Sequence, residues 1–241
     1  EAKKIIFVGS SEGGEPGKIH WFNNPADARD VLRGGNLYKA GELAWAPSTD
    51  GVGAGLVGFL RVENAERSKL EKGKVTFKSK DWGAHTNRIQ AKLEDGTTPG
   101  SKRLTLYYWP DSVREIYDNI GPIFDIKYVG SEAYASLTIE QDPTTKKASK
   151  LIVKVGADEG SAVEALSYDL GDGEYADINK LVFDINEHVD FEANMNTTGN
   201  KNLRTDELDP VDNVEIMDKV DVLALTGDLV HQTQFSQLVS V

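Results

Sequence analysis

An apolar run, Ile5–Val8, leads directly into a glycine-rich stretch that ends in Gly17-Lys18. A buried strand followed by such a loop is how many phosphate-binding proteins begin. A P-loop, however, needs a glycine five residues before the glycine of its Gly-Lys pair and a Ser or Thr directly after the lysine. Glu12 and Ile19 occupy those two positions. The spacing therefore predicts a plain turn, in which glycines permit positive φ, and no nucleotide site.

Composition excludes several classes of partner and chemistry. The 241 residues carry 27 Lys and Arg against 39 Asp and Glu, a net charge of −12. This acidic balance argues against nucleic acid and against an anionic membrane surface as partners. There is no cysteine, which excludes disulfides and thiolate chemistry. No apolar run approaches the roughly 20 residues that span a bilayer.

The first 66 or so residues have the pattern of an α/β unit. The run Ile5–Val8 suits a strand that is covered on both faces. Asn24 and Gly34 are the start and stop signals of one helix, and a second helix ends near Pro47, with an apolar side formed by Leu37, Ala40, Leu43 and Ala44. The segment 55–62 is a second apolar strand, and its distance from the first allows a right-handed crossover into a shared sheet.

The pattern changes near Lys69, where strand candidates separated by turn residues take over. Leu104, Leu106 and Tyr108 alternate with polar and aromatic neighbours as in a strand. The pattern predicts a helix over 111–122, from Val113, Ile116, Tyr117 and Ile120, and a second helix over 175–188. The segments 135–141 and 150–156 are expected to pair as a hairpin.

The region Asn196–Asn213 is polar and rich in turn residues, and an apolar segment, a helix beginning near Thr226 or Asp228 and a terminal strand follow it. We therefore expect an α+β fold: a partial α/β core domain, residues 1–68 and 213–241, with an inserted antiparallel β-rich domain of barrel or sandwich type, residues 69–212. Both ends of the sequence have the pattern of interrupted structure, so a longer parent protein is expected.

Residue types that could carry chemistry do not form a recognisable site. His20, His85, His188 and His231 lack the spacing of a helical metal pair. The segment Asp169–Asp177 fails the EF-hand pattern, because glycines stand at its third and fifth positions. The sequence therefore predicts no metal, no cofactor and no catalytic residue.

The serines, carboxylates and tryptophans do not single out a catalytic or binding site either. No serine lies in a G-x-S-x-G motif, and carboxylates are too many to single out a pair for glycoside hydrolysis. The four tryptophans lie in apolar or strand patterns, so we expect them to pack in a core or a domain interface; they are Trp21, Trp45, Trp82 and Trp109. Trp45 in particular is expected to be buried in the α/β core.

Order and spacing together resemble the tail sheath proteins of contractile bacteriophage tails. The resemblance consists of a strand, a G-G-x-P loop, a phenylalanine, a helix closed by Gly-Gly-x-Leu, a second helix and a strand ending in Arg-Val. A serine-lysine strand followed by a glycine and an asparagine completes it. The matching residues are Gly13, Gly14, Pro16, Phe22, Gly34, Gly35, Leu37, Arg61, Val62, Ala65, Ser79, Lys80, Gly83 and Asn87.

The resemblance covers about the first 95 residues well and the later segments more loosely. It implies a structural subunit, not an enzyme, that polymerises helically around a tail tube and contracts to drive the tube through the host envelope. Implied partners are further copies, the tail tube protein, and baseplate and tail terminator proteins. The implied location is the virion, with assembly in the host cytoplasm. By itself, the 241-residue chain is expected to be monomeric.

Two other classes of function stay open. A polysaccharide- or cell-surface-binding module would use exposed Trp and Tyr on the β-rich domain. A hydrolase would hold a carboxylate pair in a domain cleft.

Overall fold

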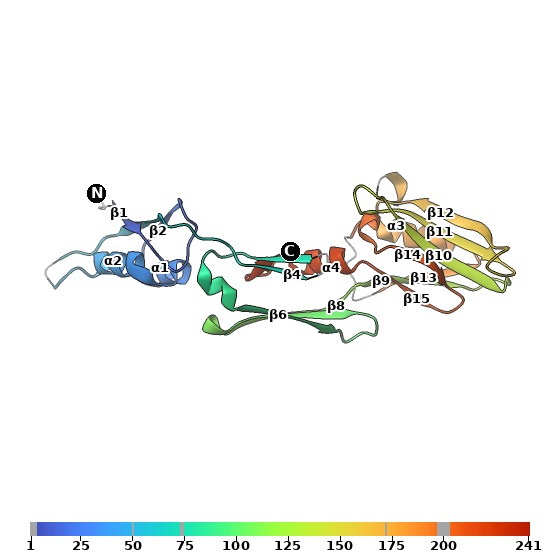
Figure 1. Cartoon of the computed structure of the whole chain (residues 1–241), viewed down its shortest axis with the longest axis horizontal. Coiled ribbons are helices and arrows are strands. Elements are labelled where there is room, and N and C mark those ends of the chain that lie inside the picture. The colour runs from blue at the N-terminus through green and yellow to red at the C-terminus, as the bar shows by residue number, and fades with distance from the viewer. Residues whose placement is uncertain (1–3, 50, 73–74, 172, 197–202) are drawn as a thin grey trace. The chain divides into compact units, whose positions relative to one another are not determined.

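The computed structural model describes residues 4–49, 51–72, 75–171, 173–196 and 203–241 (Figure 1). The chain forms two compact units. Unit 1 comprises Glu1–Gln90, Leu106–Val113 and Ser236–Ser240, and unit 2 comprises Ala91–Thr105, Arg114–Phe235 and Val241. Among the described residues, none of the helices has the length and apolar character needed to span a lipid bilayer.

Unit 1 begins with a three-stranded sheet of order β1-β3-β2. Its strands are β1 (Lys4–Gly9), β2 (Ile19–Phe22) and β3 (Leu56–Arg61). β1 and β3 pair in parallel, with Phe7 opposite Phe59, whereas β2 runs antiparallel to β3. The expected crossover from the first apolar strand into a shared sheet is confirmed.

Two helices, α1 (Pro25–Leu32) and α2 (Gly35–Trp45), connect these strands, as the sequence predicts. The Asn24 side chain caps α1 by accepting a hydrogen bond from the Asp27 amide, and Arg33 ends the helix with a φ of 61°. Both helices pack on one face of the sheet, around a core of Ala28, Leu32, Leu37, Tyr38, Val57 and Phe59.

Three expectations for this unit need correction. β1 is not covered on both faces: it is an edge strand, and Ile6 and Val8 are 47% and 60% exposed. Two residues expected on the apolar side of α2 are exposed, Ala40 and Leu43, the latter to 67%. Trp45 is only half-buried, with its ring 5.8 Å from that of Phe59.

The remainder of unit 1 contains a second small sheet of order β16-β5-β4. Its strands are β4 (Lys69–Lys72), β5 (Val75–Ser79) and β16 (Val239–Ser240), and the helical turns η1 (Ala84–Arg88) and η2 (Trp109–Asp111) complete the unit. β16 pairs antiparallel with β5, so the expected terminal strand is confirmed.

A further sheet contains β6 (Ile89–Asp95), β7 (Lys102–Tyr108) and β8 (Val113–Ile120), and the chain passes between the two units within these strands. Leu104, Leu106 and Tyr108 are all buried, which confirms the alternation predicted for β7. The helix predicted over 111–122 is wrong, because β8 is a strand.

Unit 2 has two antiparallel sheets. The four-stranded sheet has the order β12-β11-β10-β14, from β10 (Tyr134–Gln141), β11 (Ala148–Gly156), β12 (Val163–Asp169) and β14 (Val211–Glu215). The three-stranded sheet has the order β13-β9-β15, from β9 (Pro122–Tyr128), β13 (Phe191–Met195) and β15 (Val220–Leu223). The predicted hairpin is the pair β10 and β11.

Helices complete unit 2. α3 (Ile178–Glu187) confirms the second helix predicted in the β-rich region, and α4 (Leu225–Thr233) confirms the helix predicted near Thr226. Short turns lie at η3 (Gly173–Tyr175) and η4 (Thr205–Glu207). Residues 197–202 of the predicted linker and residue 172 of the segment tested for calcium lie outside the described residues.

One hydrophobic core joins both sheets and α3 of unit 2. It runs from Ile123 to Ala224 along the chain and includes Phe124, Leu151 and Ile185. The mixed α+β class is thereby confirmed, whereas the insertion of one domain into another and its boundaries remain predictions. The core extends past residue 212, because Ile216 and Val222 belong to it.

Candidate functional site

The glycine-rich loop after β1 is bonded to the protein's own backbone. The Gly13 amide donates to the Leu32 carbonyl over 2.7 Å, and the Gly17 amide donates to the Arg61 carbonyl over 2.9 Å. Two loop amides that could have faced a phosphate are therefore occupied by carbonyls, as expected of a structural turn. That the loop binds no nucleotide remains a prediction.

Three glycine segments meet where this loop lies, namely Gly13–Gly14, Gly34–Gly35 and Gly83, and we call this place the glycine junction. A Cβ on Gly35, where φ is +89°, would lie 2.9 Å from Ser11 Cα. A Cβ on Gly83, where φ is +111°, would lie 2.2 Å from the Glu12 carbonyl oxygen. The junction therefore requires glycine both for backbone conformation and for close approach of separate segments.

A buried arginine anchors the loop at this junction. Arg61 is 5% exposed, and its Nη1 donates to the Gly14 carbonyl over 3.2 Å. Its Nε and Nη2 donate to Glu63 Oε1 over 3.0 and 2.8 Å. The same carboxylate oxygen accepts the Ser11 amide over 3.2 Å. A guanidinium so nearly removed from water is stable only when its donors are satisfied, and here they hold the loop to β3.

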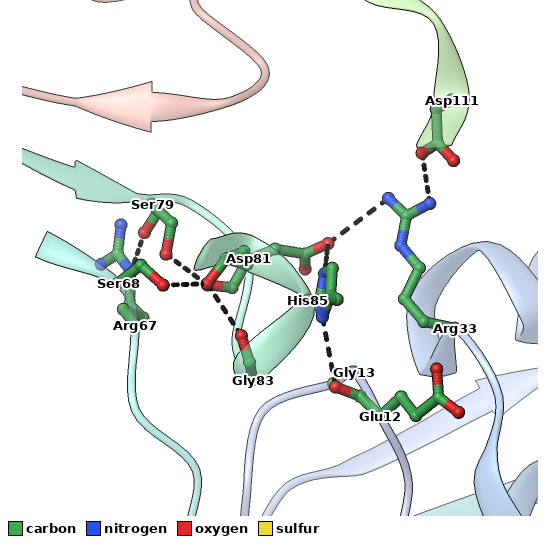
Figure 2. A network of polar contacts seen from close by, with 12 residues as sticks. Glu12, Gly13, Arg33, Arg67, Ser68, Ser79, Asp81, Gly83, His85 and Asp111 are labelled. Carbon is green, nitrogen blue, oxygen red and sulfur yellow. Dashed lines mark hydrogen bonds and ion pairs between the residues drawn. The ribbon is translucent and has the colours of Figure 1, made fainter. Parts of the chain in front are cut away.

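Charged side chains continue the contacts from the junction to η1 and η2 (Figure 2). Arg33 bonds to Asp111, and its Nη2 lies 3.5 Å from Asp81 Oδ2. The His85 ring lies between two acceptors: Nε2 is 3.4 Å from Asp81 Oδ2 and Nδ1 is 3.1 Å from the Glu12 carbonyl oxygen. These contacts connect the end of α1, the glycine loop, η1 and η2.

Hydroxyl groups extend this polar network toward β5. Ser79 Oγ donates to the Asp81 carbonyl over 2.8 Å, and Arg67 donates to the Ser79 carbonyl (Figure 2). Ser68 Oγ lies 2.6 Å from Thr86 Oγ1, which itself donates to the Gly83 carbonyl over 2.8 Å. The segment before β4 is thus held to η1.

The network also changes the acidity of one of its members. Burial alone would raise the pKa of the Asp81 carboxyl, but its hydrogen bond with His85 and the charges of His85 and Arg33 lower that pKa below its ordinary value. Asp81 is therefore held as a carboxylate beside Arg33 at neutral pH.

Two open grooves flank the glycine junction. One has a volume of about 620 Å³ and is lined by Arg61, Glu63, Asn64, Ala65, Glu66, Arg67, Ser68, Lys69, Gly83, Ala84 and Asn87. The other, of about 450 Å³, is lined by Ser11, Glu12, Arg61, Glu63, Ala84, His85 and Arg88. Both grooves are lined by acidic and basic side chains. Arg61 and Glu63, which line both of them, bond to each other. The arrangement is suited to locking segments of unit 1 together.

The residues considered for metal binding are separated in the structure. Within unit 1, His20 stacks on Phe22 with ring centroids 6.3 Å apart, and His85 belongs to the network. Within unit 2, His188 ends α3 and His231 Nε2 lies 3.7 Å from Glu207 Oε2. In the part of the chain that the structure describes, no group of three His, Asp or Glu side chains could hold a metal ion.

The tryptophans differ from the expectation that all of them pack inside. Trp21 is 41% exposed and Trp109 is 63% exposed. Trp109 lies against Tyr107, with ring centroids 3.9 Å apart, and donates to Gln90 over 3.3 Å. Packing within this chain is therefore incomplete for both side chains.

Sequence reasoning missed the acidic members of the network. Arg33 could have been noticed because it stands between a predicted helix and its terminating Gly34. Asp111, by contrast, is 78 residues from Arg33 along the chain, and nothing local indicates that the two would pair.

Comparison with known proteins shows what the chain is similar to. No family model matches the chain. It is 40% identical over 238 residues to the tail sheath protein of Staphylococcus phage Twort, and 33% identical over 238 residues to that of Bacillus phage SP01. A protein of Enterococcus phage phiEF24C that carries the same name provisionally is 42% identical over 241 residues. The matches cover 98–99% of this chain but only 40–42% of the relatives, so the chain spans about two fifths of their length.

The residues that carry the family resemblance are concentrated at the glycine junction. Gly13, Gly14, Gly34, Gly35, Arg61 and Gly83 all take part in its contacts. The expected resemblance is confirmed: over nearly its whole length, this chain is homologous to the tail sheath proteins of bacteriophages.

Proposed function

We propose that the protein is a structural subunit of a contractile phage tail sheath. In this role it polymerises helically around the tail tube and contracts to drive the tube through the host envelope. The observation that carries the proposal is the match of nearly the whole chain to proteins named as tail sheath proteins in several phages.

The contacts inside unit 1 support a mechanical role. A sheath subunit must pass load between its segments without local unfolding. The glycine junction and the Arg33–Asp81–His85 network tie the α/β part of unit 1 to η1 and η2 through buried and partly buried polar contacts. Such groups favour one arrangement of the segments, because any other leaves buried donors unsatisfied.

The proposed partners follow from this role. They are further copies of the same subunit, the tail tube protein, and baseplate and tail terminator proteins. Nucleic acid and membrane are not among them, in keeping with the net charge of −12. The subunit performs no bond chemistry; it assembles in the host cytoplasm and resides in the virion.

Electron microscopy of the full-length sheath polypeptide tests this proposal. Purified and concentrated, it should form hollow tubes with a regular helical repeat. A variant that carries Gly83→Ala, which disturbs the glycine junction, should form fewer or irregular tubes. A wild-type polypeptide that is folded but remains unassembled under all salt conditions would contradict the proposal.

One observation favours the alternative of a polysaccharide-binding module. Trp109 is 63% exposed beside Tyr107, and exposed aromatic rings are the groups on which sugars stack. Binding of this chain to host cell-wall polysaccharide that is lost in Trp109→Ala would support that alternative. The sheath role predicts no such binding.

A further inference from the structure

One face of the first sheet of unit 1 is apolar and uncovered. α1 and α2 pack on the opposite face, against Phe7, Phe22 and Phe59. Alternation along the strands places a second set of apolar side chains on the uncovered side. We call this set the open face; it consists of Ile6, Val8, Ile19, Trp21 and Leu60.

The open face is continuous across all three strands. Ile6 pairs with Gly58, which pairs with Trp21, and Val8 pairs with Leu60, which pairs with Ile19. A Cβ on Gly58 would lie 3.0 Å from Trp21 Cζ3 and 3.1 Å from Ile6 Cγ1. The two large side chains therefore close over the central strand and form one surface.

Four side chains of the open face are strongly exposed to solvent. Ile6, Val8, Ile19 and Trp21 are 47%, 60%, 41% and 41% exposed. A contiguous apolar patch of this kind on a folded protein usually marks a surface that another element covers. The sheet is mixed, with β1 parallel and β2 antiparallel to β3. A sheet face that stays in contact with water normally carries polar side chains, whereas this one carries apolar side chains.

We propose that the open face is covered by a helix of the sheath polypeptide that lies outside these 241 residues. The relatives carry more than half of their length outside the match, so a longer sheath polypeptide has ample chain to supply it. The covering element presents an amphipathic helix, because a helix stripe fits the groove between β-strand side chains of a parallel pair. The inference rests on the tail sheath assignment but on neither polymerisation nor contraction.

Thiol labelling tests this proposal, because the chain has no cysteine of its own. Val8→Cys places a single thiol on the open face. Leu43→Cys is the matched control, since Leu43 is 67% exposed on α2 in the same unit. Reaction with a maleimide is timed for each variant, in the 241-residue chain and in the unassembled full-length polypeptide.

In the 241-residue chain both thiols should react quickly. In the unassembled full-length polypeptide, Val8→Cys should react at least tenfold more slowly and Leu43→Cys at an unchanged rate. Equal rates for Val8→Cys in both proteins would overturn the proposal. So would protection that appears only on assembly, which would assign the cover to a neighbouring subunit, or protection of the 241-residue chain that grows with its concentration, which would assign it to a second copy.

A second variant, Val8→Lys, distinguishes the covering of the open face from a direct effect of the substitution on the fold of unit 1. Val8→Lys should leave the melting temperature of the 241-residue chain nearly unchanged, since the side chain points to solvent there. The same variant should lower the melting temperature of the full-length polypeptide clearly, because it would bury an unpaired charge. A full-length variant that melts like the wild type would contradict a covered open face.

Discussion

At the scale of single residues, Gly83 combines a positive φ with a close approach to Glu12. Gly83→Ala should cost about 2–5 kcal/mol, from a backbone penalty of about 1–2 and an overpacking penalty of about 1–3. Gly17→Ala is the matched control, because φ is +74° there but nothing lies within 4 Å of the added Cβ. Urea unfolding should show a loss of only about 1–2 kcal/mol for the control. Equal losses would mean that the close approach at the glycine junction is unimportant.

Asp81 should make stability depend on pH. Its pKa is lowered in the folded state, so the stability it contributes is present above the unfolded value of about 3.9 and is lost as the pH falls through the folded value. Asp81→Asn should therefore destabilise the chain at pH 7 by up to about 1 kcal/mol and by less at pH 3. Urea unfolding at both pH values measures this. Asp30→Asn, an exposed position on α1, should show no comparable difference; a uniform loss for Asp81→Asn would exclude a charge effect.

Asp228 should make the folded state less stable as the pH rises, which is the opposite of the effect of Asp81. It is fully buried on α4, where burial raises its pKa although the Gly121 amide donates to it over 2.9 Å. A raised folded value means that its ionisation opposes folding as the pH rises above the unfolded value of about 3.9. Asp228→Asn keeps an acceptor for Gly121, so its stability relative to wild type should improve from pH 4 to pH 7. Asp228→Ala leaves the buried amide unpaired and should lose about 1–3 kcal/mol. An Asn variant whose relative stability is independent of pH would contradict this account.

At the scale of elements, α1 shows what local sequence can predict. Asn24 caps the helix as the sequence indicates, whereas the predicted stop is displaced by one residue, because Arg33 and not Gly34 is the left-handed cap that ends the helix. Asn24→Ala should cost about 1 kcal/mol, because the Asp27 amide loses its acceptor. Asn23→Ala removes only an exposed acceptor of the Asn24 side-chain amide and leaves the acceptor of the Asp27 amide in place, so it should cost less than about 0.5 kcal/mol. Thermal unfolding of both variants measures the difference, and equal shifts would argue against the cap.

β8 shows where local sequence is ambiguous. Val113, Ile116, Tyr117 and Ile120 fit a helical period, yet the segment is a strand in which Ile116 is 50% exposed. Its β-branched and aromatic residues favour a strand, and pairing within a sheet decided between the two patterns. The prediction that β1 is covered on both faces is wrong for a similar reason. An apolar run indicates a strand, but it does not show which element covers each face of that strand.

The polar network could be predicted only in part, because it depends on long-range contacts. The cap at Asn24 and the turn glycines are local features that the sequence indicates. The pairing of Arg33 with Asp111, and of Arg61 with the Gly14 carbonyl, depends on how distant segments fold together. A single sequence carries no local signal for such pairs.

At the scale of the whole molecule, the core of unit 2 should fold by itself. All of that core lies between Ile123 and Ala224, so a piece spanning residues 91–235 should unfold cooperatively on heating. A piece spanning 69–212 lacks Ile216, Val222 and Ala224 of the same core and should be much less stable. Circular dichroism melting curves compare the two. A broad, non-cooperative transition for 91–235 would show that unit 2 depends on the rest of the chain.

The tail sheath assignment is the central claim, and its most direct test is the location of this protein in the virion. Antibodies raised against the 241-residue chain and detected by immunogold electron microscopy should label the tail along its whole length below the capsid. Labelling should be absent from virions incubated with antibody that has first been absorbed on the purified chain. Gold confined to the tail tip, the fibres or the capsid would contradict the account.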